Sequence, residues 1–114
     1  MSYNYLRKGR YSQANQDYFI TIVTHKRRHL LSDFYTARIV INEMMRLEKE
    51  QHMHWLTWIV MPNHIHGLIQ LTSTELSNAI RLLKGRSAYA INKHLSSTGS
   101  VWQANYYDHA LRAE

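Results

Sequence analysis

The chain has 114 residues, 45% of them hydrophobic, which fits one domain with a modest core. It has no run of about 18 apolar residues and no apolar N-terminal segment, so neither a transmembrane helix nor a signal peptide is expected. It has no cysteine, so disulfides and thiolate metal sites are not expected either. A cytoplasmic protein is the simplest interpretation. Lys and Arg number 14 against 8 Asp and Glu, and the net charge of +6 favours a polyanionic partner, although many basic proteins bind none.

The first third of the chain predicts an arm, a strand and a helix. Residues 1–17 are polar and predict an irregular lead-in. Residues 18–24 are rich in β-branched and aromatic side chains, which predicts a strand. A basic loop, residues 25–29, follows it. Asp33 is a suitable N-cap for a helix that runs to about residue 51 with apolar residues at helical spacing.

The middle of the chain predicts a β-hairpin. Residues 52–60 and 64–71 are both apolar and suited to strands, and Pro62-Asn63 between them is a typical turn pair. Because the connection is short, the two strands are expected to pair antiparallel.

A second helix and a last strand complete the prediction. The helix runs from Glu75 to about Leu95, with Ser73 or Thr74 as its cap, and residues 101–112 predict a strand with several aromatic side chains. The resulting order β-α-β-β-α-β predicts a single α+β domain of the ferredoxin-like class, in which two helices cover one face of an antiparallel sheet.

Two histidines on the predicted strand 64–71 are the strongest candidates for a functional site. His64 and His66 are two residues apart and therefore point to the same face, while Ile65 points to the other. Two imidazoles so placed can bind one divalent metal ion. A further ligand has to come from elsewhere, and Asn63, Gln70 and Asp108 qualify by residue type alone.

A second His-x-His pair, His52 and His54, raises the alternative of a closed four-histidine zinc site. If Pro62-Asn63 is a two-residue turn, Met61 pairs with His64 and every second residue of the first hairpin strand shares its face. His52 and His54 then lie on the opposite face, which argues against the zinc site. A one-residue bulge would reverse this arrangement.

The segment Met61–Gly67, Met-Pro-Asn-His-Ile-His-Gly, resembles the His-hydrophobic-His motif of the HUH single-strand DNA transposases and nucleases. More closely, the chain resembles the tyrosine transposases associated with repetitive extragenic palindromes (REP), relatives of the small insertion-sequence transposases. The other matching stretches follow in the same order along the chain: residues 7–11, 18–21, 83–87 and 101–112.

The resemblance implies a ferredoxin-like fold and a DNA transposase. It implies that His64 and His66 hold Mg²⁺ or Mn²⁺, and that the substrate is single-stranded or hairpin DNA of palindromic repeats. It implies strand cleavage by a tyrosine that leaves a 5′-phosphotyrosine, and a homodimer in which subunits exchange their tyrosine helices. Metal polarisation and covalent capture are physically reasonable parts of such a reaction.

The family nucleophile lies on a helix that follows the region matching residues 101–112, so it is expected beyond Glu114 and the chain is expected to be truncated. Tyr106 and Tyr107 are weak substitutes, because as strand neighbours they point to opposite faces and at most one can face the histidines. The predicted consequence is that this chain alone forms no phosphotyrosine bond.

Clusters of cations are the candidate DNA contacts, since Lys and Arg bind phosphates. Gly85, inside a predicted helix, further suggests a close approach of DNA or of another strand. The cations are Arg7, Lys8, Arg10, Lys26, Arg27, Arg28, Arg81, Lys84 and Arg86.

Three functions remain open from the sequence. The first is a single-strand DNA transposase domain. The second is a catalytically inactive DNA-binding module with a vestigial metal site. The third is a zinc-stabilised fold without enzymatic activity.

Overall fold

The computed structural model describes residues 16–72 and 74–111. Two short 3-10 turns, η1 (His25–Arg27) and η2 (Leu30–Ser32), connect the first strand to the first described helix. The strands and helices are β1 (Asp17–Val23), α2 (Phe34–Lys49), β2 (Met53–Met61), β3 (His64–Leu71), α3 (Leu76–Leu95) and β4 (Tyr107–Ala110).

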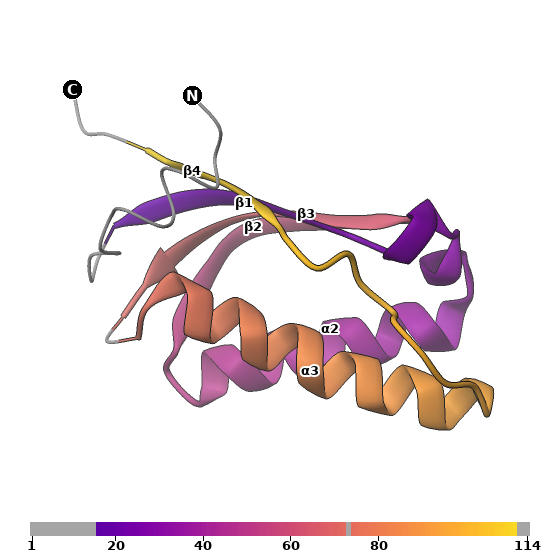
Figure 1. Ribbon diagram of the computed structural model, residues 1–114. Coiled ribbons are helices and arrows are strands. Elements are labelled where there is room, and N and C mark those ends of the chain that lie inside the picture. The colour runs from indigo at the N-terminus through magenta and orange to yellow at the C-terminus, as the bar shows by residue number, and fades with distance from the viewer. Residues whose placement is uncertain (1–15, 73, 112–114) are drawn as a thin grey trace.

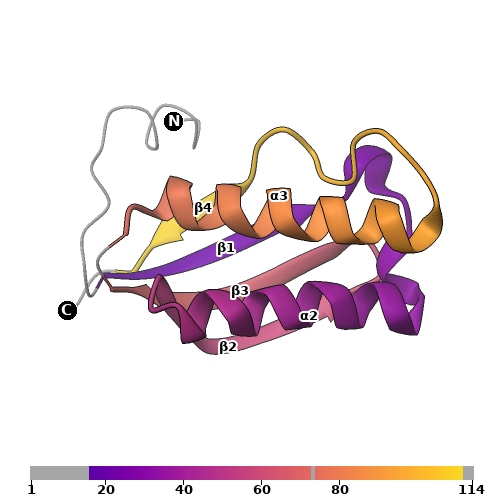
Figure 2. The same cartoon turned by 90° about the horizontal axis from the view of Figure 1, so that it is seen from below.

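The four strands form one antiparallel sheet in the order β2-β3-β1-β4. Helices α2 and α3 lie side by side on one face of this sheet (Figures 1 and 2). This is the ferredoxin-like α+β arrangement that the sequence predicts. Neither α2 nor α3 covers the second face, which we call the open face. Within the described ranges, no helix combines the length and the apolar character needed to cross a bilayer.

The core lies between the sheet and the two helices because the strands alternate. On β1, Ile20 and Ile22 are buried, and on β3 Ile65 and Ile69 are buried. Thr21 on β1 and His66 and Leu68 on β3 alternate with these residues and point to the open face. This alternation leaves one face of each central strand available for polar side chains.

The predicted N-cap residue is confirmed for α2 but not for α3. Asp33 caps α2, since its Oδ2 atom accepts hydrogen bonds of 2.9 Å from both the backbone N–H and the hydroxyl of Thr36. The prediction for α3 is wrong at Thr74. Glu75 is the N-cap residue and makes no side-chain cap bond, while the Thr74 hydroxyl bonds to Nδ1 of His52 at 3.1 Å. Ser73 lies outside the described residues.

The predicted last strand is also longer than the observed one. Only residues 107–110 pair as β4, and Arg112 lies outside the described residues. Residues 99–106 instead form a strap that runs from the end of α3 back to the sheet (Figure 1). The indole N–H of Trp102 donates to the Ser87 hydroxyl on α3 at 2.9 Å, and a single β-bridge joins Trp102 to Thr24. The indole bond holds the strap against α3, while the bridge and a 2.8 Å bond from the Gln103 N–H to the Val23 carbonyl keep it beside the end of β1.

The hairpin of β2 and β3 has the register predicted from a two-residue turn. Met61 is opposite His64, and Ile59 is opposite His66. His64 and His66 therefore share the open face with these two residues.

Further along the hairpin, a bulge changes the register between Trp55 and Thr57. Leu56 is the extra residue, and beyond it His54 lies opposite Gln70. His54 is consequently on the open face, so the prediction that it points to the helix side is wrong. A one-residue insertion moves every following side chain to the other face.

Gly67 is required because the Trp55 ring occupies the space above it. A Cβ at Gly67 would lie 2.8 Å from Cζ3 of Trp55, whose Nε1–H donates to the Met44 carbonyl of α2 at 2.9 Å. Around Gly85, by contrast, no described atom lies within 4 Å of an added Cβ. The suggestion that another strand approaches Gly85 is therefore wrong for the described residues.

These two glycines give a matched prediction. Gly67→Ala is expected to lower the free energy of unfolding by about 1–3 kcal/mol, because the ring or the strand has to move. Gly85→Ala is expected to raise it by up to about 1 kcal/mol, since alanine is the better helix former. Urea unfolding of both variants checks this. Equal stability of Gly67→Ala and the wild type would contradict the inference that the Trp55 ring leaves no room for a Cβ at position 67.

Candidate metal and nucleic-acid site

The candidate site begins on β3, which is an inner strand of the sheet. His64 is half-buried and His66 is exposed, and both lie on the open face, as predicted from their spacing. Their ring centroids are 6.4 Å apart, and the ring planes are nearly perpendicular at 88°. The two imidazoles are thus close neighbours on a rigid strand.

The neighbouring residue Asn63 orients the first imidazole. Nδ1 of His64 lies 2.9 Å from Oδ1 of Asn63. An amide oxygen only accepts hydrogen bonds, so in the neutral imidazole this contact selects the tautomer with the proton on Nδ1 and the lone pair on Nε2. A metal ligand is commonly held in this way by a partner on its other nitrogen.

The second imidazole is held across the sheet by Thr21 of β1. Thr21 is the register partner of His66, and its Oγ1 atom lies 2.8 Å from Nδ1 of His66. Nε2 is again the nitrogen that this contact leaves for a ligand. No signal in the sequence points to Thr21, because a β-branched run predicts a strand without giving the register of its partner.

An apolar and aromatic surface surrounds the two histidines. One row across the open face holds Ile59, His66, Thr21 and Tyr107 on neighbouring strands. The Phe19 ring is 6.0 Å from the ring of His66 and is 39% exposed. Flat, partly exposed rings beside a candidate metal site are suited to contact with unpaired bases.

The two imidazoles could bind a metal ion whose remaining coordination positions are filled by other ligands. In residues 16–72 and 74–111, no cluster of three or more His, Cys, Asp or Glu could hold a metal. Asp108 is buried and pairs with Ile20 on the helix side, so it does not join the histidines. Gln70 is on the open face but four residues beyond His66. Two imidazoles are the donors that the described site offers, a set compatible with Mn²⁺ or, less favourably, Mg²⁺.

The four histidines of the hairpin do not converge. Nδ1 of His52 bonds to Thr74, and its Nε2 lies 3.4 Å from the Glu50 carboxylate. His54 shares the open face with His66, but it is opposite Gln70, two cross-strand rows further along that face. The structure thus offers no closed four-histidine site within its described part.

Comparison with known proteins identifies the family. The model of the family described as "Transposase IS200 like" matches residues 12–111. The chain belongs to the IS200-like transposases. An uncharacterized protein of Haemophilus influenzae is 24% identical over 144 residues, which cover 98% of this chain and 76% of that protein.

Two solved structures share the fold of this IS200-like transposase. One is a REP-associated tyrosine transposase bound to a REP hairpin, with a TM-score of 0.76 at 20% identity over 92% of this chain. The chain spans 61% of the length of that protein. The other is a putative transposase from Deinococcus radiodurans, with a TM-score of 0.71 at 20% identity, covering 89% of this chain and 83% of the other.

The structure separates the two tyrosines that were weak catalytic candidates. Tyr106 is 6% exposed and belongs to the core, whereas Tyr107 is 47% exposed and lies on the open face opposite Thr21. As predicted, only one of them is on the side of the histidines. Tyr107 is separated from His66 by the width of β1.

The predicted DNA contacts on the loop after β1 divide into two kinds. Arg28 is used within the protein, because its Nη2 donates to the Ser100 carbonyl at 2.6 Å and its Nε to the His25 carbonyl at 3.2 Å. The side chains of Lys26 and Arg27 are exposed. Three further predicted contacts, Arg7, Lys8 and Arg10, lie outside the described residues.

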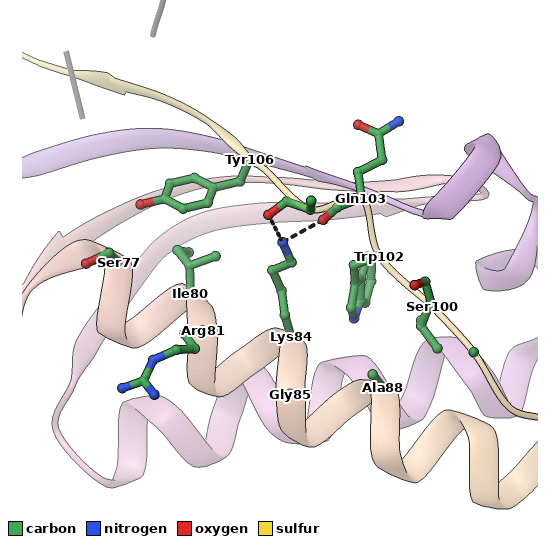
Figure 3. A pocket seen from close by; sticks show the side chains of 13 residues that line it. Ser77, Ile80, Arg81, Lys84, Gly85, Ala88, Ser100, Trp102, Gln103 and Tyr106 are labelled. Atoms are coloured by element: carbon green, nitrogen blue, oxygen red, sulfur yellow. Dashed lines mark hydrogen bonds between the residues drawn. The ribbon is translucent and has the colours of Figure 1, made fainter. Parts of the chain in front are cut away.

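Two of the predicted contacts on α3, Arg81 and Lys84, line a groove of about 570 Å³ between this helix and the strap. Lys84 reaches across the groove and donates to the carbonyls of Gln103 at 2.6 Å and Ala104 at 3.1 Å (Figure 3). The Arg81 guanidinium donates to Asn78 at 3.2 Å and lies at the outer edge of the groove.

Arg86 faces α2 rather than the groove. Its Nη1 forms a 2.7 Å ion pair with Glu50, and the Arg86 guanidinium lowers the pKa of that carboxyl. Arg86 and Lys84 both have partners within the protein, which charge patterning in the sequence did not reveal. A DNA contact by either remains a prediction.

Proposed function

We propose that this IS200-like chain binds single-stranded or hairpin DNA and belongs to a metal-assisted reaction that cleaves and rejoins a DNA strand through a tyrosine. The main support is the pair His64 and His66, with Nδ1 of each imidazole held by a neighbour and Nε2 left for a ligand. The hairpin bound to the structurally similar REP-associated transposase supports the choice of substrate.

His64 and His66 are the residues that would hold Mg²⁺ or Mn²⁺. When bound, such an ion would stabilise negative charge on the phosphoryl oxygens of the scissile group. Imidazole donors favour Mn²⁺ over Mg²⁺. Asn63 and Thr21 orient the rings so that little reorganisation is needed when the ligand binds.

Other residues of the chain bind and position the strand. Phe19 lies beside His66 and Tyr107 ends the same cross-strand row, and both provide partly exposed rings on which unpaired bases can stack. The exposed cations Lys26, Arg27 and Arg81 supply phosphate contacts, which give affinity without sequence preference.

A homodimer is part of the same proposal. β2 is an edge strand of the sheet and exposes several large apolar side chains: Leu56 at 50%, Trp58 at 38%, Ile59 at 53% and Met61 at 38%. An apolar edge of this kind is a template for pairing with another chain. Sedimentation equilibrium measures the association, and a monomer at high concentration would exclude it.

The nucleophile of the reaction is neither Tyr106 nor Tyr107 in this proposal. Tyr106 is buried among core residues. Tyr107 belongs to the β4 ladder, where its register partner Thr21 stands between it and His66. In this proposal the active tyrosine belongs to another segment, as the resemblance to the tyrosine transposases implies.

We therefore expect the 114-residue chain to bind a hairpin oligonucleotide in the presence of Mn²⁺ without forming a covalent adduct. The measurement is a native gel for binding and a denaturing gel for the adduct, with a labelled hairpin that carries a single-stranded flank. An adduct formed by the wild type and lost in Tyr107→Phe would show that Tyr107 is the nucleophile.

The second candidate function is a catalytically inactive DNA-binding module with a vestigial metal site. The small donor set found within the described residues favours it. The two functions differ in the effect of the ion. Hairpin affinity that rises with Mn²⁺ supports the metal-assisted reaction, whereas affinity that is independent of Mn²⁺ supports the inactive module.

A further inference from the structure

The turn that follows β1 has an unfavourable backbone conformation at two consecutive residues. Lys26 has φ of 56° and ψ of 23°, and Arg27 has φ of 54°. Both are in the left-handed region, which residues with a Cβ seldom adopt. Glycine or asparagine would adopt these angles more readily. The angles therefore do not explain why long cationic side chains stand here.

The same turn is firmly attached on two sides. Thr24 is fully buried, and its backbone N–H donates to the Asn63 carbonyl at 2.9 Å. The next N–H, that of His25, donates to the Val101 carbonyl of the strap at 2.8 Å. The Thr24 hydroxyl also donates to the Arg28 carbonyl at 2.7 Å and closes the turn. We call residues 24–28 the basic turn.

These attachments place the basic turn beside the metal candidates. Asn63, whose backbone binds Thr24, is the residue whose side chain orients His64. Val23, the last residue of β1, is the register partner of His64. Figure 1 shows η1 at the end of the sheet where β1 finishes and β3 starts.

The three cations of the basic turn have different surroundings. Arg28 is the structural one, because its guanidinium binds two backbone carbonyls. Lys26 and Arg27 are exposed, and among the described residues neither side chain takes part in a hydrogen bond or an ion pair. Residues 24–32 contain no Asp or Glu that could neutralise them. The basic turn thus holds two cations on a strained backbone that is bonded on two sides, and their side chains form no polar contact with the described residues that would stabilise the fold.

We propose that Lys26 and Arg27 form a clamp for consecutive phosphates of a single-stranded nucleic acid that runs past His64. The proposal rests on the proposed DNA-binding function and assigns the part of the site that holds the backbone of the strand next to the metal ligands. Backbone strain retained at a functional site is a known way of presenting side chains in a fixed direction. Fixed cations beside a metal site would set where along the strand the ion meets a phosphate.

The test uses Lys26→Asn with Arg27→Asn, which removes both charges and keeps residues that tolerate the left-handed region. The expected result is a Tm equal to that of the wild type or a few degrees higher. Affinity for a single-stranded oligonucleotide is expected to fall about 10-fold or more at low salt. The slope of log K against log salt should become shallower by about 1.4, or about 0.7 for each lost phosphate contact.

The control pair is Lys49→Asn with Lys93→Asn, which removes the same charge from the last turns of α2 and α3. It is expected to leave the salt slope near that of the wild type. The clamp is wrong if the control loses as much affinity, if the basic-turn variant binds like the wild type, or if that variant has a clearly lower Tm. A wild-type chain that binds no oligonucleotide would instead overturn the proposed DNA-binding function itself.

Discussion

Alanine at both His64 and His66 is expected to weaken the binding of Mn²⁺ at least about 100-fold, because loss of supporting contacts alone commonly costs 10–100-fold. The physical reason is that the two Nε2 atoms are the oriented donors on the open face. Isothermal titration calorimetry measures the affinity, and the electron paramagnetic resonance signal of free Mn²⁺ checks it independently.

His54 is a matched control for this experiment. It is an exposed histidine on the same sheet face, but it lies opposite Gln70 and away from His66. His54→Ala should leave Mn²⁺ affinity unchanged, whereas Asn63→Ala should lower it about 10-fold by releasing the His64 ring. If the double alanine variant keeps wild-type affinity, or if His54→Ala loses as much, the metal site lies elsewhere.

The parts of the fold that sequence predicted correctly are those set by short-range rules. β3 has the predicted bounds, because apolar alternation and a Pro62-Asn63 turn leave little freedom in such a hairpin. The register of Met61 with His64 follows from the same turn. The start of α2 also follows from a local contact, the Asp33 side chain bonded to Thr36.

The parts that were missed depend on contacts between distant segments. The bulge at Leu56 coincides with Trp55, whose backbone N–H donates to Glu48 of α2 at 2.7 Å and whose ring packs against Gly67. Hydrophobic alternation alone does not reveal such a contact. The strap is a second example, since Trp102 bonds to Ser87 on α3 instead of extending β4.

In the candidate site, too, local spacing was predicted correctly and contacts between distant segments were missed. Sequence spacing alone placed His64 and His66 on one face, but Thr21 entered the site only through the cross-strand register. Charge patterning found cations without showing which of them have partners inside the protein. Arg28 is one that binds backbone carbonyls, and Lys84 is another.

Lys84→Met is expected to lower the free energy of unfolding by about 1.5–3 kcal/mol, the usual range for hydrogen bonds from a charged group. The side chain is half-buried, and its ammonium group joins α3 to the carbonyls of Gln103 and Ala104 in the strap. Methionine keeps the length of the chain but cannot donate, so these carbonyls lose their partner. Urea unfolding followed by tryptophan fluorescence measures the change.

Arg86→Met on the same helix is the control, and it separates a structural role of Lys84 from the predicted DNA contact. Arg86 pairs with an exposed carboxylate, Glu50, and exposed ion pairs contribute little to stability. Lys84→Met should therefore be clearly less stable than Arg86→Met, yet below its Tm it should keep the wild-type salt slope of DNA binding. The opposite pattern, with full stability and a slope shallower by about 0.7, would mean that Lys84 leaves the strap and binds a phosphate. The groove would then open toward the DNA when the strand binds, and the contact predicted from sequence would replace the one seen in the free protein.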